Sequence, residues 1–428
     1  LGDVYKRQVI LQFTGKELIK SEPDASSFPS GGLRETCAAR GYTAWDCTSP
    51  AFVKTTDEGT CILCIPAAFT SYTGESLDYK TPLLRSMDAI SKEALKALAM
   101  FGNTTAKKVT SSVGPEQEYF LIDKKKFAKR TDLKLCGRTL FGAVPPKGQE
   151  LDDQYFAAIK DKIASYMTEL NEELWKYGIL AKTQHNEVAP AQHELAPIFS
   201  TTNIATDQNH LVMATMKKIA AKHDLECVLH EKPFAGVNGS GKHNNWSIST
   251  DEGENLIDPG KHPETNLQFQ FFLAAVLAAV DNNAELLRLS ASSAGNDHRL
   301  GANEAPPAII SAFLGEQLQS IVEQIIEKGE ATESPKGKTY VSGASTLPTF
   351  TMDATDRNRT SPFAFTGNKF EFRMVGSTQS IAFPMMVLNT IVADQIKKMT
   401  DELEGADDFE TACKALIRRE LLSLIHIS

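Results

Sequence analysis

The sequence lacks a hydrophobic run long enough to cross a membrane: among its 428 residues, the longest apolar stretch is 271–280. A bilayer-spanning helix needs about 20 apolar residues, so this stretch predicts a helix buried in a protein core. The sequence also lacks an excess of basic residues, since its formal charge is −9. That charge argues against nucleic acid or an anionic membrane as the main partner.

Cysteine is sparse and unevenly spaced. The seven cysteines, an odd number, run from Cys37 to Cys413, and only Cys61 and Cys64 form a CxxC pair. That pair lies in an apolar, strand-like stretch with no second pair nearby, so neither a zinc site nor a redox motif is predicted. The pattern favours a reducing, cytoplasmic compartment.

The sequence has no initiating Met, and its ends read LGDVYKRQ and LLSLIHIS. We expect residues 1–8 and 421–428 to be extraneous, like translated adapter sequence, and the rest to be an internal fragment of a longer protein. Residues 9–79 are rich in Ser, Gly, Pro and Thr, which predicts a small β-rich unit. In residues 80–420, long helical patterns mixed with paired strands predict a larger domain of the α+β class.

Apolar spacing predicts the elements of the larger domain. Helices are expected from a cap at Thr81, from Asp152 or Asp153 to Gly178, at about 207–223, within 263–289 and at 316–328. Strands are expected at 114–123 and on both sides of a turn at Pro190, within 182–199. The charged run 124–130 is predicted to be a solvated loop.

The stretch GVNGSGKH differs by one residue from a phosphate-binding P-loop, which needs Ser or Thr after Gly-Lys and then a helix. His243 occupies that position, and Trp246 and Ile248 alternate with polar residues, which predicts a strand. A P-loop is therefore excluded. Alternate side chains of a strand share a face, and the glycines would let the backbone approach a ligand. The predicted polar row is His243, Asn245 and Ser247.

Five glutamates are predicted on strands beside apolar residues: Glu116, Glu118, Glu187, Glu194 and Glu371. The first two share a strand face, the turn at Pro190 can bring the next two together, and the last shares a face with Arg373. Carboxylates this close repel one another unless a cation lies between them. Carboxylate oxygens are preferred by Mg²⁺ and Mn²⁺, and Mn²⁺ also accepts imidazole. With His243, the set predicts two divalent ions, which typically serve phosphoryl transfer or hydrolysis.

Six motifs in order resemble those of glutamine synthetase: GPEQE, NEVAPAQHE, KPF…NGSGKH, RLGANEAP, NRTSPF and KFEFR. Loops such as DASSFPSGGLR are most similar to the type III branch, and the resemblance covers about 10–420. It implies an incomplete β-grasp-like N-terminal unit, followed by a catalytic domain with a curved antiparallel sheet flanked by helices. The implied reaction joins ammonia to the γ-carboxylate of glutamate through γ-glutamyl phosphate, with ATP as co-substrate, in glutamine biosynthesis and nitrogen metabolism. The alternatives are a γ-glutamyl ligase that uses another amine, or an inactive truncated chain.

The resemblance also implies roles for single residues. One metal site would comprise Glu118, Glu187 and Glu194, and a second Glu116, His243 and Glu371, with two or more Mg²⁺ or Mn²⁺ ions in all. Glutamate would contact Asn238, Gly239, His243 and Arg299, and ATP would contact Phe199, Ser247 and Lys369. The catalytic residues would be Glu304 on a flap, Arg359 and Arg373 at the phosphoryl group, and Asp24. The last would reach a neighbouring subunit's active site in a ring-forming homo-oligomer.

The sequence departs from the family pattern in two places. Between Glu304 and Arg359 lie the residues 305–358, many more than shorter family members have there. The arginine that usually follows the NR motif is replaced by the segment SPFAF. Contacts to phosphate in that segment are therefore less clearly implied than the metal ligands.

Overall fold

The structure, a computed structural model, describes residues 41–56, 58–71, 74–143, 147–335, 339–351 and 360–424. The chain divides into two compact units, the first ending at Arg85 and the second beginning at Ser86. Two predicted site residues, Asp24 and Arg359, lie outside the described residues, as do 1–8.

The described part of the first unit is built from two antiparallel strand pairs. Strand β1 (Gly41–Trp45) pairs with β4 (Ala67–Ser71), and β2 (Phe52–Thr55) pairs with β3 (Cys61–Cys64). Helix α2 (Lys80–Met100) follows. The Asp78 carboxylate accepts a hydrogen bond of 3.1 Å from the Thr81 backbone N–H. Asp78 therefore provides the cap hydrogen bond that the sequence had suggested for Thr81.

The second unit contains a sheet of nine described strands, in the order β11-β14-β15-β10-β5-β7-β6, with β8 and β9 also paired to β5. All its pairs are antiparallel except β11 with β14. The strands are β5 (Val109–Asp123), β6 (Ala181–Asn186), β7 (Gln192–Pro197), β8 (Ser200–Thr201), β9 (Leu225–Val228), β10 (Lys242–Thr250), β11 (Ala312–Phe313), β14 (Phe363–Phe365) and β15 (Phe370–Phe372). Together with the helices that flank it, this sheet confirms the predicted α+β class.

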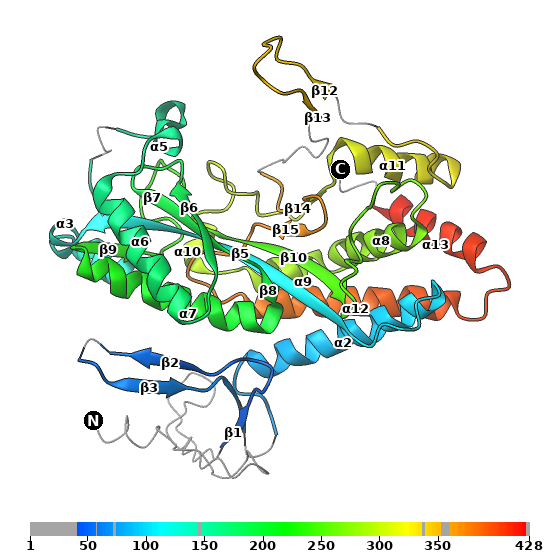
Figure 1. Ribbon diagram of the computed structural model, residues 1–428, viewed down its shortest axis with the longest axis horizontal. Coiled ribbons are helices and arrows are strands. Elements are labelled where there is room, and N and C mark those ends of the chain that lie inside the picture. The colour runs from blue at the N-terminus through cyan, green and yellow to red at the C-terminus, as the bar shows by residue number, and fades with distance from the viewer. Residues whose placement is uncertain are drawn as a thin grey trace. The chain divides into compact units, whose positions relative to one another are not determined.

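Helices α7 and α12 lie along one face of this sheet (Figure 1). Helix α8 contains the predicted buried stretch, and every residue from Phe269 to Val280 is buried. The main helices are α6 (Asp161–Lys176), α7 (Thr202–Lys222), α8 (Leu267–Asn282), α9 (Ala284–Ser290), α11 (Gly315–Lys328), α12 (Ala382–Leu403) and α13 (Phe409–Ser423). None of the described helices combines the length and hydrophobicity that crossing a membrane requires.

Short elements fill the connections. They are α3 (Lys124–Ala128), α4 (Thr131–Cys136), η1 (Glu150–Asp152), α5 (Asp153–Phe156), α10 (Ala294–Asp297), and the strand pair β12 (Thr339–Tyr340) and β13 (Phe350–Thr351). The strand pair, α11 and β11 belong to the segment 305–358 that the sequence marked as long.

Several predicted boundaries were wrong for local reasons. Residues 124–128 of the charged run 124–130 form the helix α3 and not a loop, because the Asp123 carboxylate accepts from the backbone N–H of Lys126 and caps the helix. The helix expected from Asp152 or Asp153 is interrupted by the extended Ala157 and resumes as α6. The helix expected within 263–289 is divided into α8 and α9 at Asn283. Helix α7 begins at Thr202, earlier than predicted.

Candidate active site

Strand β10 has the predicted period of two. Trp246 and Ile248 are fully buried, and the Trp246 indole Nε1 donates to Asn389 Oδ1 on α12 at 2.9 Å. His243 and Asn245 are on the opposite face and only half-buried. The stretch that resembles a P-loop is thus a loop leading into a strand, as predicted, and it delivers His243 opposite Glu116 of β5.

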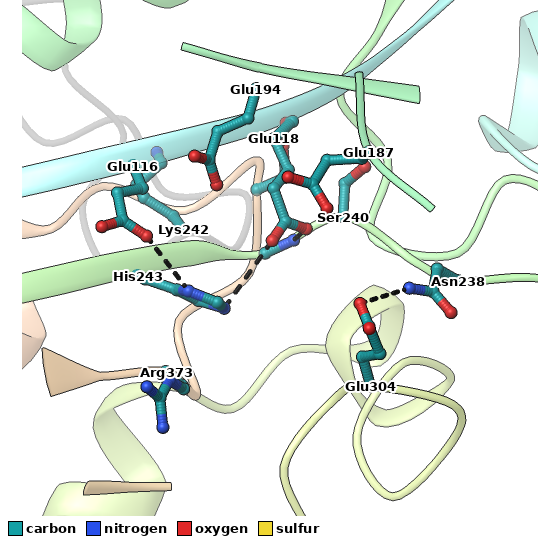
Figure 2. A network of polar contacts seen from close by, with 12 residues as sticks. Glu116, Glu118, Glu187, Glu194, Asn238, Ser240, Lys242, His243, Glu304 and Arg373 are labelled. Atoms are coloured by element: carbon teal, nitrogen blue, oxygen red, sulfur yellow. Dashed lines mark hydrogen bonds and ion pairs between the residues drawn. The ribbon is translucent and has the colours of Figure 1, made fainter. Parts of the chain in front are cut away.

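The first acidic group surrounds His243. Its Nδ1 lies 3.3 Å from Glu116 Oε2 and 3.1 Å from Glu371 Oε1, and the ligand atoms of all three residues lie within 4.8 Å of one another. The other oxygen of Glu116 accepts from Asn245, and the other oxygen of Glu371 accepts from Arg373 at 2.6 Å. These are the three residues that the resemblance implied for one metal site, and Figure 2 shows Glu116 beside His243.

The second acidic group lies on the hairpin of β6 and β7. His185 Nδ1 is 3.6 Å from Glu187 Oε1, and His185 Nε2 is 3.4 Å from Glu194 Oε1. The turn brings the two glutamates together as expected, although Glu187 lies in the turn and not on a strand. His185 was missed by sequence reasoning. Its position two residues before Glu187, the same spacing as Glu116 and Glu118, was the available signal.

Glu118 lies between the two groups. Its Oε2 accepts from the backbone N–H of Gly241 at 2.7 Å, and its Oε1 is 3.7 Å from His243 Nε2. It is also directly opposite Glu194 in the pairing of β5 with β7. Among the described residues, the ligand atoms of His185, Glu187 and Glu194 lie within 4.8 Å of one another. In this group His185 takes the place that the resemblance implied for Glu118.

Both groups line one pocket of about 400 Å³. The pocket gathers most of the predicted site residues: Glu116, Glu118, Glu187, Glu194, Asn238, Gly239, His243, Arg299, Glu304, Lys369, Glu371 and Arg373. Two predicted nucleotide contacts are not part of its lining. Ser247 is buried and donates to Asn255 and to the carbonyl of Asn368, both at 3.1 Å, and Phe199 is 67% exposed.

The pKa values in the pocket reflect crowded negative charge. Burial raises the pKa of Glu194 well above its ordinary value, and the charges of Glu116, Glu187 and Glu118 raise it further. Burial alone would lower the pKa of His243, but hydrogen bonds to Glu116 and Glu371 raise it well above 6.5. The raised pKa of Glu194 therefore favours its protonated form, whereas the hydrogen bonds of His243 favour its charged form and lower the pKa of Glu371 to about 2.

Arg299 lines the pocket and is almost fully buried. Its guanidinium donates to the carbonyl oxygens of Arg373 and Val375, at 3.0 and 3.4 Å. A Cβ added at Gly241 would collide with this guanidinium, and one at Gly239 would lie 3.1 Å from Arg299 Cγ. The glycines of the NGSG motif thus make room for the Arg299 side chain. This role of the glycines was not predicted from the sequence.

Glu231 is also buried, and unlike Arg299 it was not predicted from the sequence. Its carboxylate accepts from the backbone N–H of Thr378 at 3.0 Å and from the Thr378 hydroxyl. A Cβ at Gly376 would lie 2.6 Å from Glu231 Oε1, and one at Gly295 would collide with Oε2. Its negative charge acts on the buried Arg299.

Glu304 is fixed by a hydrogen bond within the pocket. Its Oε2 accepts from Asn238 Nδ2 at 2.8 Å, a contact drawn in Figure 2. Asn303, just before it, has a positive φ of 56°. Asparagine tolerates this left-handed region better than most non-glycine residues, because its short side chain can form local hydrogen bonds.

Two family models match the chain. "Glutamine synthetase type III N terminal" matches residues 3–86, and "Glutamine synthetase, catalytic domain" matches residues 92–311. The chain is similar to the type-3 glutamine synthetase of Dictyostelium discoideum, with 52% identity over 98% of the chain and 57% of that protein. It is also similar to the glutamine synthetase of Bacteroides fragilis, with 52% identity over 94% of the chain and 55% of that protein.

One solved structure has the same fold. A cryo-EM structure of Plasmodium falciparum glutamine synthetase matches with a TM-score of 0.60 and 17% identity, over 90% of this chain and 68% of that one. The chain spans little more than half the length of the two relatives described above.

Proposed function

Because this chain belongs to the glutamine synthetase family, we propose that the full-length protein joins ammonia to the γ-carboxylate of L-glutamate. ATP is the co-substrate, and the products are glutamine, ADP and phosphate. The observation that carries this proposal is the convergence of two carboxylate–imidazole groups on one pocket that Arg299, Arg373 and Lys369 also line. Such a pocket suits a phosphate chain and a carboxylate substrate, both of which bring negative charge.

The donor sets fit divalent ions. Carboxylates with one imidazole suit Mn²⁺, and the carboxylates alone suit Mg²⁺. Glu116, His243 and Glu371 would hold one ion, and Glu187 and Glu194 would hold the other, with Glu118 or His185 as the third ligand. The raised pKa of Glu194 supports this assignment, because a cation would relieve the repulsion that raises it. Bound ions would neutralise the phosphate charge and orient the phosphoryl group.

The remaining residues would bind and orient the substrates. In the first step an oxygen of the glutamate γ-carboxylate attacks the terminal phosphorus of ATP and ADP leaves. The nitrogen of ammonia then attacks the acyl carbon and phosphate leaves, while a carboxylate takes the surplus proton. We assign Arg373 to the charge on the phosphoryl group, Glu304 to the ammonium proton and to shielding the acyl phosphate, and Asn238, Gly239, His243 and Arg299 to glutamate.

Further parts of the proposal rest on the resemblance. Phe199, Ser247 and Lys369 would contact ATP, and Asp24 and Arg359 would complete the site in a ring-forming homo-oligomer. We also propose an N-terminal unit over 9–79 and a catalytic domain over 80–420; the family-model matches to 3–86 and 92–311 support a division of the chain near this boundary. The described cysteines are free thiols, which supports a cytoplasmic location.

The test is an assay of the full-length protein with ATP, Mg²⁺ and glutamate, in which phosphate and glutamine are both measured with and without ammonium. We expect glutamine formation that needs ammonium and is lost in Glu371→Gln. Glu226→Gln is the matched control, because Glu226 is on β9 of the same sheet and does not line the pocket. Consumption of another amine in place of ammonium would overturn the proposal, as would an absence of any amide product.

A further inference from the structure

Gln149 forms a paired contact with Asn238 from a distant part of the chain. Its Oε1 accepts from the Asn238 backbone N–H at 2.8 Å, and its Nε2 donates to Asn238 Oδ1 at 3.0 Å. Asn238 is 5% exposed. One glutamine amide therefore satisfies both the main chain and the side chain of a residue in the pocket wall.

This pairing fixes which way the Asn238 amide faces. Because Oδ1 accepts from Gln149, the NH₂ end of the amide must face the other side, where it donates to Glu304 Oε2 at 2.8 Å. An amide turned the other way would place an oxygen against the Glu304 carboxylate and an NH₂ group against the Gln149 NH₂ group. Gln149 therefore sets the orientation of the Asn238 amide and, through it, the hydrogen bond from Asn238 to Glu304.

The backbone that presents Gln149 is unusual. Leu151 and Asp152 have consecutive positive φ values of 55° and 53°, which non-glycine residues rarely adopt. The Asp152 N–H bonds back to the Gln149 carbonyl at 3.2 Å. A few residues on, Tyr155 lines the same pocket with its ring 5.8 Å from that of His185. The segment is thus held against the pocket at both ends.

We propose that Gln149 is a positioning residue: it orients the Asn238 amide so that Nδ2 holds the Glu304 carboxylate, and so keeps the loop 301–306 against the pocket. The catalytic consequence rests on the proposed function. If the loop opens, water can add to the acyl carbon of γ-glutamyl phosphate and release phosphate, which regenerates glutamate. ATP is then hydrolysed with no amide formed. Gln149 is therefore a determinant of coupling between ATP cleavage and amide formation.

The test variants remove one or both of the hydrogen bonds between Gln149 and Asn238. Gln149→Glu keeps the acceptor for the Asn238 backbone N–H but loses the donor to Oδ1, so the Asn238 amide turns over and presents Oδ1 to Glu304. Gln149→Ala removes both hydrogen bonds, and the Asn238 amide can then still donate to Glu304. We therefore expect Gln149→Glu to loosen the loop 301–306 more than Gln149→Ala does. The control is Glu150→Gln, because the Glu150 side chain accepts only from the nearby Gly148 N–H among its described hydrogen bonds.

The first readout is hydrogen–deuterium exchange of the full-length protein, which does not depend on activity. Peptides covering 301–306 should exchange about tenfold faster in Gln149→Glu, several-fold faster in Gln149→Ala, and at the native rate in Glu150→Gln. Exchange in α8 should not change in any variant, which establishes that the variants are folded. Native exchange at 301–306 in Gln149→Glu would overturn the proposal whether or not the protein makes glutamine.

The second readout is the ratio of phosphate released to glutamine formed. A purely structural defect lowers both products together and leaves the ratio near one. We expect the ratio to rise several-fold in Gln149→Glu and less in Gln149→Ala, while the KM for ATP stays within about twofold. An unchanged ratio in an active Gln149→Glu enzyme would contradict the role in coupling. If no variant and no parent protein makes glutamine, the proposed function fails, and the exchange experiment alone decides on Gln149.

Discussion

The clearest structural prediction concerns the space around Glu231. Replacing Gly376 with Ala places a Cβ 2.6 Å from Glu231 Oε1 and 2.7 Å from its Cγ, closer than unbonded atoms allow. Gly376 does not have a positive φ, so the substitution introduces a collision without backbone strain. Overpacking of this kind typically costs about 1–3 kcal/mol.

Removing the carboxylate in Glu231→Ala has a different cost. The Thr378 N–H and hydroxyl lose their acceptor, and an unsatisfied buried polar group costs about 1–3 kcal/mol. The buried Arg299 also loses a nearby negative charge. We expect a total of about 3–5 kcal/mol, the range for breaking a buried charge interaction.

The two substitutions should not be additive. In Glu231→Ala the atoms that Gly376→Ala would strike are gone, so the added methyl should cost less than about 1 kcal/mol in that background. The double mutant should therefore be about 1–2 kcal/mol more stable than the sum of the single effects. Urea unfolding of the four proteins measures this coupling. Additivity within about 0.5 kcal/mol would refute the packing of Glu231 against Gly376.

Three further predictions test other parts of the fold. Trp246→Phe leaves the buried Asn389 Oδ1 without its donor and should lower the free energy of unfolding by about 1–3 kcal/mol in the same urea assay. Burial raises the pKa of Cys227 and Cys413 to about 12, so both should resist a thiol reagent that labels the exposed Cys61; equal labelling rates in the native protein would be inconsistent with this fold. Hydrogen bonds from Lys397 and Lys96 lower the pKa of Asp401 to about 2 from 3.8. The stabilising effect of the Asp401 carboxylate is therefore complete above its pKa in the unfolded chain and is lost as the pH falls from about 4 toward 2. The thermal midpoints of the native protein and of Asp401→Asn should differ most above pH 5 and converge below pH 4.

Part of the site could be predicted because it depends on local periodicity. The alternation after His243 was enough to place that residue on the polar face of a strand, and the same rule put Glu116 and Glu118 on one face. Pro190 indicated a turn, which brought Glu187 and Glu194 together. In each case the decisive contacts follow from a repeat of two residues along one strand or from a single turn.

The missed residues act through contacts between distant segments. Gln149 meets Asn238 across 89 residues, and Glu231 meets Thr378 across 147, so no local pattern reveals either contact. The structural role of Gly241 could not be predicted either, because a glycine before a strand does not indicate which side chain fills the space beside it. The wrong loop prediction after Asp123 has a simpler cause, since a charged run is compatible with an exposed helix once an aspartate caps it.

A Mn²⁺ titration of the full-length protein tests whether each of the two acidic groups in the pocket binds a divalent cation. Calorimetry should detect two ions per chain. Glu371→Gln should weaken one of them and Glu194→Gln the other, while the control Glu226→Gln binds both. Two ions bound with native affinity in both pocket variants, or no Mn²⁺ bound by the native protein, would contradict the assignment of these two groups as metal sites.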